Sequence, residues 1–407
     1  MRPCRGTGDG VINRKAVWAL GLAQLISWGI SFYYIGVFGD LIAADLGWSR
    51  AFVFGGFSAA LITMGAMSSF VGKTIDIVGG RPVLMAGAKL SAVSLSLLAM
   101  SDGVTLYYAA WIGLGIAMRC TLYDAAFAAL VKIEGGSARR SITQITLLGG
   151  LAATCFWPLG HFLAETYDWR QATLIYAGFA LILLLLFATL PDAKDARTFE
   201  PSEPDRKDAP QRRGNLARSA MLYATIIALG NGLHAGMSAH LITLLTDLGL
   251  AAGLAVSVAA LRGVGQTTGR IAELAFGEKV HPIHLNTFAA ALIVASFALG
   301  FLAAGLYLTA AAFVFFYGVA TGLLTITRGT LPLVLFNPHR YGAMVGILLV
   351  PSFLVSAASP VVFAYVLDVF GPYATLGVAL TVGVVMVLAS LALPSREPGE
   401  AMESGGS

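Results

Sequence analysis

Long apolar runs separated by short polar segments recur along the whole chain. Each run is close to the ~20 apolar residues that an α-helix needs to cross the ~30 Å hydrocarbon layer of a bilayer. Twelve runs can be distinguished, and each predicts one spanning helix. Their approximate bounds are 15–41, 49–72, 82–101, 104–131, 141–165, 169–190, 219–246, 251–275, 286–304, 307–336, 342–368 and 373–393. The pattern therefore predicts an all-α integral membrane protein.

The second six predicted helices repeat the first six at a constant spacing. Asp45-Leu46-Gly47 recurs as Asp247-Leu248-Gly249, Pro158 matches Pro360, and Ala172-Thr173-Leu174 matches Ala374-Thr375-Leu376, each at an offset of 202 residues. Such internal repeats are how many membrane transport proteins are built. We predict two pseudo-symmetric six-helix halves, residues 1–191 and 219–396. The proline-rich, highly charged segment 192–218 is expected to be a solvated linker, and 397–407 a disordered tail.

Charge is scarce, at 12% of the residues, and it is unevenly distributed between the two predicted membrane faces. Of the 26 lysines and arginines, 19 fall on the face that holds both termini and the linker. Only Arg50 and Arg170 fall on the other face. Basic residues gather on the cytoplasmic side of membrane proteins, so both termini are predicted to be cytoplasmic. The net charge of +4 therefore belongs to loops, and we expect the lipid bilayer, not a nucleic acid, as the partner.

Other chemistry-bearing patterns are absent from the sequence. Cys4, Cys120 and Cys155 are scattered, which predicts neither a disulfide framework nor a metal site. There is no phosphate-cradling loop, ATPase domain or pair of catalytic carboxylates, so we expect no enzyme activity and no cofactor. The basic residues 1–14 precede a long apolar run without a clean cleavage site, so a retained first helix is predicted instead of a signal peptide.

A short polar segment, 72–81, separates the second and third predicted helices. Gly72, Gly79 and Gly80 permit close backbone approach and left-handed turns, while Asp76 and Arg81 lie where a helix end can receive charge. The pattern G-x-x-x-D-x-x-G-x-R resembles the signature loop of the major facilitator superfamily between its second and third helices. Ile77 stands where that family usually has arginine.

The resemblance implies that the segment 72–81 is a tight loop that gates the cytoplasmic side. Asp76 and Arg81 would latch that gate, with Asp76 facing a helix N-terminus of the other half. At the offset of 202, Asp76 maps to Glu278, which makes the second copy of the loop degenerate. A competing register aligns Gly269 and Arg270 with the signature, but it requires a deletion in the eighth helix.

Two charges lie deep in the fourth predicted helix. A charge inside a bilayer costs several kcal/mol, so Arg119 is expected to face a polar cavity or a partner. Asp124 follows five residues later, about 140° around a regular helix, which predicts that the two do not pair directly. In the superfamily, helices 1, 4, 7 and 10 line the central cavity. Arg328 on the tenth helix falls at a depth similar to Asp124, so either a cross-cavity ion pair forms or Arg328 snorkels to the interface.

The seventh and eighth helices add further polar groups. Arg262 is expected to be functional, whereas Arg270 could be neutralised by Glu273 or Glu278. His234 and His240 lie on different faces of the seventh helix, where an imidazole either titrates beside a cavity or packs in a hydrogen bond.

The first predicted helix carries a cluster of aromatic residues. These are Trp28, Phe32, Tyr33 and Tyr34. They could form an aromatic wall of the cavity or serve as packing, and only the tyrosine hydroxyls would need partners.

Three segments also resemble the monocarboxylate-porter-like branch of the superfamily. They are Gly47-Trp48-Ser49-Arg50, the arginine-bearing eighth helix, and Asp368-Val369-Phe370-Gly371-Pro372-Tyr373. In that branch an arginine of the eighth helix binds the substrate carboxylate. The ungapped register places it at or near Arg270, one to two turns from Arg262, and does not choose between them.

We therefore predict a monomeric inner-membrane secondary transporter of a small organic anion that works by alternating access. Its substrate would be held by some of Arg119, Arg262, Arg270 and Arg328, with Tyr33, Tyr34 and His234 nearby. Proton symport is the expected coupling, through Asp124 first and His234 second. One alternative is an exporter of drugs or other amphiphiles driven by proton antiport, and another is a membrane sensor that binds a ligand without moving it.

Overall fold

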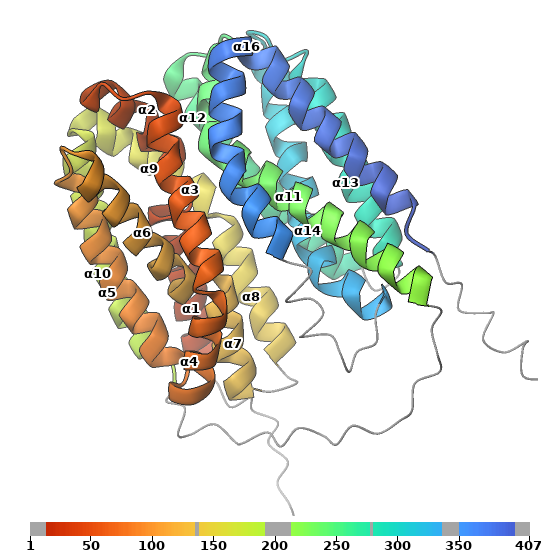
Figure 1. Cartoon of the computed structure of the whole chain (residues 1–407), viewed down its shortest axis with the longest axis horizontal. Coiled ribbons are helices and arrows are strands. Elements are labelled where there is room, and N and C mark those ends of the chain that lie inside the picture. The colour runs from red at the N-terminus through yellow and green to blue at the C-terminus, as the bar shows by residue number, and fades with distance from the viewer. Residues whose placement is uncertain (1–13, 135–137, 192–212, 277–279, 336–349, 395–407) are drawn as a thin grey trace, which may run out of the picture.

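The computed structural model describes residues 14–134, 138–191, 213–276, 280–335 and 350–394. These residues are helical throughout, without a β-strand (Figure 1). The helices of the first half are α1 (Arg14–Ile30), α2 (Ile35–Leu46), α3 (Arg50–Ala66), α4 (Ser68–Val78), α5 (Gly80–Ala99), α6 (Val104–Thr121), α7 (Tyr123–Glu134), α8 (Ala138–Gly150), α9 (Ala152–Thr166) and α10 (Trp169–Ala188). Those of the second half are α11 (Arg213–Asp247), α12 (Ala252–Phe276), α13 (Pro282–Gly300), α14 (Tyr307–Leu335) and α16 (Val350–Leu391).

Within the described residues every predicted span coincides with helical structure, which confirms the all-α membrane fold. By length and apolar composition, eight helices in the described ranges can cross a membrane, or nine if the bent pair α3 and α4 is one span. The difference from twelve has two causes. The helix α16 contains two predicted spans joined at Gly371, whose φ of 81° breaks the helical backbone. The helices α11 and α12 are 35 and 25 residues long but interrupt their apolar runs with polar side chains.

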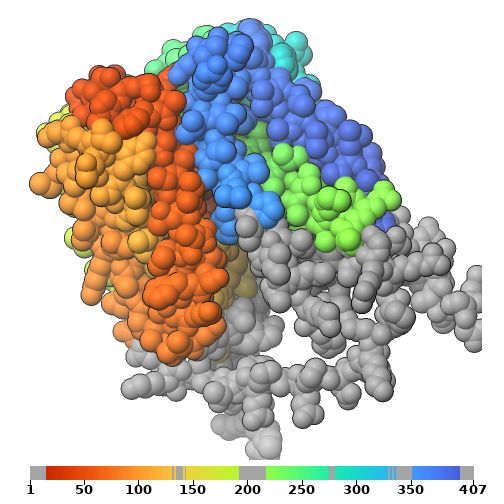
Figure 2. Space-filling model, in the orientation of Figure 1, coloured from red at the N-terminus to blue at the C-terminus, as the bar shows by residue number. Residues whose placement is uncertain are grey.

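The repeat predicted from the sequence is visible in the helix boundaries. The helix α3 begins at residue 50 and α12 at residue 252, while α5 begins at 80 and α13 at 282. Both pairs keep the offset of 202. Figure 1 shows the two groups of helices side by side, with α3 of the first half lying along the beginning of α16 of the second. The same seam lies on the surface in Figure 2, where the two segments are in direct contact.

Besides the bent pair α3 and α4, three spans of the first half are broken near their middle. The helices α1 and α2 are separated by a turn at residues 31–34, α6 and α7 by the extended backbone of Leu122, and α8 and α9 by Leu151. Irregular backbone at membrane depth is tolerated only where it is buried in protein or lines a cavity. The breaks therefore mark the inner faces of these spans.

The signature segment differs from the predicted loop. The helix α4 continues to Val78, and the chain turns at Gly79 alone, where φ is 93°. Gly80 then lies directly against Ala129 of α7, with no room for a Cβ atom, whereas Gly72 has open space around it. The predicted tight loop over 72–81 is therefore wrong: a single residue in a conformation that favours glycine is enough to reverse the chain.

Some predicted boundaries are shifted or lie outside the described residues. The helix α11 begins at Arg213, inside the segment predicted to be a linker up to residue 218. The remainder of that linker, the tail 397–407 and Glu278 fall outside the described residues.

Candidate functional site: a central cavity between the halves

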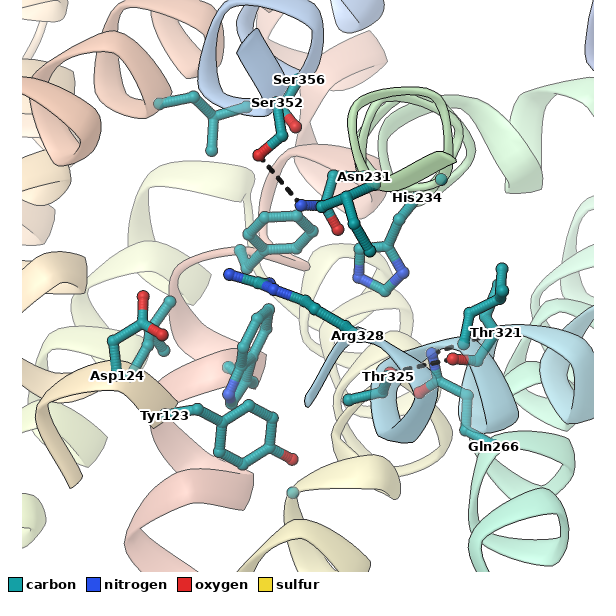
Figure 3. A pocket seen from close by; sticks show the side chains of 18 of the residues that line it. Tyr123, Asp124, Asn231, His234, Gln266, Thr321, Thr325, Arg328, Ser352 and Ser356 are labelled. Atoms are coloured by element: carbon teal, nitrogen blue, oxygen red, sulfur yellow. Dashed lines mark hydrogen bonds between the residues drawn. The ribbon is translucent and has the colours of Figure 1, made fainter. Parts of the chain in front are cut away.

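A cavity of about 170 Å³ lies between the two halves of the protein. Its walls come from α1, α3, α7 and α8 on one side and from α11, α12, α14 and α16 on the other. Figure 3 shows that Arg328 reaches from α14 across this space, with its guanidinium directed toward the side that carries Asp124. Both halves therefore supply residues that line the cavity, and the first-half residues among them include those at the breaks in its spans.

The first half contributes an aromatic wall. Trp28 lies at its centre, with ring centroids 5.0 Å from Phe32, 6.2 Å from Tyr33 and 5.1 Å from Tyr123. Three of these four residues were predicted from the sequence, and Tyr123 was missed because it follows the break at Leu122. Trp28, Phe32, Tyr33 and Tyr123 all line the cavity, so they form a wall and not merely internal packing.

The second half contributes polar groups that sequence reasoning did not single out. The Asn231 amide donates to the Ser352 hydroxyl at 3.1 Å, and the Gln266 amide donates to the Thr321 hydroxyl at 3.3 Å. Ser356 and Thr325 lie beside them, as Figure 3 shows. Polar side chains buried in apolar surroundings seek hydrogen-bond partners, so their presence facing one cavity signals a wet or ligand-binding surface. Of these residues, Asn231, Thr321 and Thr325 lie on the seventh and tenth predicted helices, which the superfamily resemblance places at the cavity, whereas Gln266, Ser352 and Ser356 lie on helices that it does not.

Arg119 and Asp124 form an ion pair, contrary to the prediction. The prediction assumed one regular helix, but Leu122 is extended, with φ −77° and ψ −177°. Arg119 therefore lies in the last turn of α6 and Asp124 in the first turn of α7. Each charge faces the helix end whose dipole stabilises it. Asp124 lines the cavity with its side chain 40% exposed, whereas Arg119 lies behind it, 14% exposed.

Arg270 and Arg328 both line the cavity. Arg270 is buried, donates to the Thr146 carbonyl, and lies 5.9 Å from the centre of the Tyr123 ring. Its Nε has no hydrogen-bond partner among the described residues. In the described parts of the chain no ion pair joins a carboxylate to Arg262, Arg270 or Arg328. Glu278, one of the two carboxylates expected to neutralise Arg270, lies outside those parts.

Arg262 is fully buried behind His234, which separates it from the cavity. It donates to the Ser238 hydroxyl at 2.8 Å and to Nδ1 of His234 at 2.7 Å. A guanidinium only donates, so Nδ1 is the acceptor, and Nε2 is the nitrogen of the His234 ring that can carry a proton. Arg262 thus orients the His234 ring, which lines the cavity and lies 5.3 Å from the Phe32 ring.

Two residues considered from the sequence lie away from the cavity. Tyr34 is buried inside the first half, where its hydroxyl shares a 2.6 Å hydrogen bond with Thr173. The break between α1 and α2 turns Tyr34 to the opposite face from Tyr33. His240 is buried against the carbonyl of Pro360 and the Phe54 ring. We interpret both as packing residues.

An ion-pair network joins the two halves at the end of the molecule where α2 ends and α3 and α12 begin, hereafter the sealed end. Arg50 donates to Asp40 of its own half at 2.8 Å and to Asp368 of the other half at 2.8 Å. Thr243 of the second half donates to Asp40 at 2.6 Å. This network was missed because its members are far apart in the sequence. It joins the halves directly.

Replacing Arg50 by alanine is expected to loosen the sealed end, because both carboxylates lose their shared cation. These groups are roughly one-third exposed, so screening limits the effect to about 1 kcal/mol, or roughly fivefold in population. Spin labels at Val104 and Leu308 would report a longer and broader distance distribution. The control is Arg170→Ala, because its partners Asp45 and Asp102 both belong to the first half. Equal distributions for Arg50→Ala and wild type would contradict this role.

Gly36 permits a close approach of the two halves between α2 and α11. A Cβ atom there would overlap the Ser238 carbonyl oxygen of α11. Gly36→Val is therefore expected to force α2 and α11 apart and to lower transport several-fold at normal expression. Gly178→Val is the control, since a Cβ at that position meets nothing. Accessibility of a cysteine introduced at Thr243 would measure the separation. Unchanged accessibility would contradict the expected effect.

Helical spans in two repeated halves around one central cavity are the architecture of a membrane transporter. Residues 20–283 match the Major Facilitator Superfamily, and the chain belongs to that superfamily. It is a multi-pass membrane protein of a transporter superfamily.

Curated relatives are similar over only part of the sequence. The multidrug resistance proteins MdtL of Escherichia coli and of Shigella dysenteriae are each 30% identical over 202 residues, which are 48% of this chain and 49% of theirs. The chain thus matches about half the length of these relatives.

Solved structures match over nearly the whole length. The nucleoside transporter NupG has a TM-score of 0.71 at 13% identity, and the match covers 94% of this chain and all of that one. The human organic anion transporter MFSD10 has a TM-score of 0.64 at 18% identity, covering 93% and 99%. At such low identities the likeness concerns the fold alone.

Proposed function

We propose that the protein carries small organic anions across the bacterial inner membrane by alternating access, coupled to protons. The observation that supports this proposal is the charge of the cavity. Asp124 is the carboxylate among the residues that line it, and Asp124 is already paired with Arg119. Arg262, Arg270 and Arg328 lie at or directly behind the wall without a carboxylate partner within the described residues.

An excess of buried positive charge is unfavourable until an anion compensates it. A cation in the membrane interior costs several kcal/mol, and the cost falls when the charge is paired and hydrogen-bonded. Arg328 offers its guanidinium to the cavity, and its planar fork suits a carboxylate. A substrate carboxylate at Arg328, with Arg270 close by, therefore supplies the missing counter-charge.

Coupling to protons follows from the Arg119–Asp124 pair. Protonation of Asp124 removes the negative partner of Arg119, and the free guanidinium then favours an anion in the cavity. His234 is less suited to carry the proton, since its Nδ1 already accepts from Arg262 and an imidazolium would meet that like charge. Proton and anion would thus bind together, as symport requires.

The conformation supports an inward-facing state. The halves are joined at the sealed end by the Arg50 network, and in Figure 1 they diverge toward the end where α4 lies. We assign that end to the cytoplasm from the distribution of lysine and arginine. The helix α4 packs against α5 and α7 of its own half. On this proposal Asp76 and Arg81 engage the second half when the cytoplasmic end closes.

Proteoliposome uptake tests the proposal. Labelled small carboxylates are offered with an imposed inward proton gradient, and a protonophore is the control. Gradient-driven accumulation of at least one carboxylate, abolished by the protonophore, is expected. Saturable binding without uptake would indicate a sensor. Neither binding nor uptake of any carboxylate would contradict the proposal.

The second candidate function is export of drugs or other amphiphiles by proton antiport. Two observations favour it: the relatives named multidrug resistance proteins, and the aromatic wall around Trp28. Competition separates the two. Under the first function, one organic anion competes with the binding of another, and cationic or neutral amphiphiles do not. Under the second function, cationic or neutral amphiphiles compete with each other, and organic anions do not.

A further inference from the structure

We infer that the anion carries an aromatic ring next to its carboxylate, as benzoate does. This inference rests on the proposed function and narrows its substrate class. It comes from the arrangement of the cavity walls: the cationic groups and the aromatic side chains lie next to each other, and they come from opposite halves.

The distances between cations and rings set the shape of the ligand. Arg270 and Tyr123 both line the cavity, and the Arg270 guanidinium lies 5.9 Å from the centre of the Tyr123 ring. The neighbouring Tyr33 ring lies 5.8 Å from the guanidinium of Arg262, which is buried behind the wall. Trp28 contacts both of these rings, at 6.2 and 5.1 Å between centroids. A carboxylate held on the arginine side therefore places the adjoining group of the ligand against aromatic faces and edges.

The aromatic cluster is arranged as rings prefer. Phe32 meets Tyr33 edge to face at 5.7 Å, and the imidazole of His234 lies 5.3 Å from Phe32. Offset and edge-to-face arrangements at such separations are favourable, and each adds to the area that is buried. An aromatic ligand extends this cluster, whereas an aliphatic ligand gains only the buried area.

The size of the cavity agrees with one ring. The cavity holds about 170 Å³. An apolar cavity of about 150 Å³ is known to bind benzene. One ring with one carboxylate thus fits in this conformation, with the acid group toward Arg328 and the hydrogen-bonding pair of Asn231 and Ser352 beside it.

Matched ligands test the inference. We would measure the binding of benzoate, cyclohexanecarboxylate and propanoate to the purified full-length protein in detergent by calorimetry. The first two ligands share ring size and charge and differ in aromaticity. Benzoate is expected to bind about two- to tenfold more tightly than cyclohexanecarboxylate, which is the range for an aromatic contact beyond area. Propanoate is expected to bind more weakly than both.

A substitution in the aromatic wall tests whether that wall causes the preference for benzoate over cyclohexanecarboxylate. Phe32→Leu is expected to abolish most of the difference between benzoate and cyclohexanecarboxylate, and its retained binding of the latter shows that it folds. Phe288→Leu, on an exposed position of α13, is the matched control and should keep the preference. Equal binding of benzoate and cyclohexanecarboxylate to wild type would overturn the inference while the organic-anion proposal stands. Binding of none of the three would count against the proposed function itself.

Discussion

Replacing Arg328 by glutamine is expected to lower the rate of organic-anion uptake at limiting concentration by roughly 100-fold. Arg328 lines the cavity on α14, and among the described residues its side chain has neither a carboxylate partner nor a hydrogen bond. A charge-assisted hydrogen bond contributes about 1.5–3 kcal/mol, and its loss inside a dry site falls at the upper end of that range. The measurement is initial uptake of a labelled carboxylate into proteoliposomes.

Two further variants make the Arg328 result specific. Arg328→Lys keeps the charge but loses the planar fork, so it should retain an intermediate rate. Lys89→Gln removes a cation from the exposed face of a spanning helix, α5, and should leave uptake unchanged. A rate for Arg328→Gln within about twofold of wild type would place the substrate carboxylate elsewhere, with Arg270 as the next position to examine.

The fold was predictable because its signals repeat. Apolar runs of the length of a bilayer mark each span, and matched positions such as Pro158 and Pro360 recur at one offset. The positively charged side, by contrast, remains a prediction. The repeat also explains a contact that no local pattern suggested: Asp40 and Thr243 occupy nearly equivalent positions of the two halves and meet between them at the sealed end.

The cavity was predictable only where helices stay regular. Trp28, Phe32 and Tyr33 were placed correctly as a possible wall, but the turn that follows moves Tyr34 into the core of its own half. The error at Arg119 and Asp124 has the same origin. No glycine or proline marks the break at Leu122, so the sequence between the two charges reads as continuous helix.

Long-range ion pairs could not be read from the sequence. Arg50 and Asp368 are separated by 318 residues, and no local pattern in either segment indicates that the two side chains pair. Arg262 shows the reverse case. It was expected to be functional, and it lies behind the His234 ring, where it contacts the cavity wall through that ring. Depth along a helix was predictable, whereas the direction of the side chain depended on how the halves pack.

The last expected result concerns Asp124→Asn, which should separate accumulation from exchange. Asparagine has nearly the shape of a protonated aspartic acid and cannot release a proton. Accumulation of the anion driven by a proton gradient is therefore expected to fall at least about tenfold, while exchange of labelled for unlabelled anion persists within about twofold. Arg119→Gln, in contrast, leaves Asp124 without its ion-pair partner and should impair both processes.

Measuring both processes in the same vesicles distinguishes coupling from damage to the protein. Glu165→Gln is the control, because this carboxylate is exposed on α9 outside the cavity. If Asp124→Asn also abolishes exchange, the carboxylate acts in binding or structure and not as the proton carrier. If accumulation survives at wild-type level, the proton is carried by another group, and His234, the histidine of the lining, is the next residue to substitute. Under the proposed function, the ion pair at the break in the fourth span would therefore carry the coupling of transport to protons.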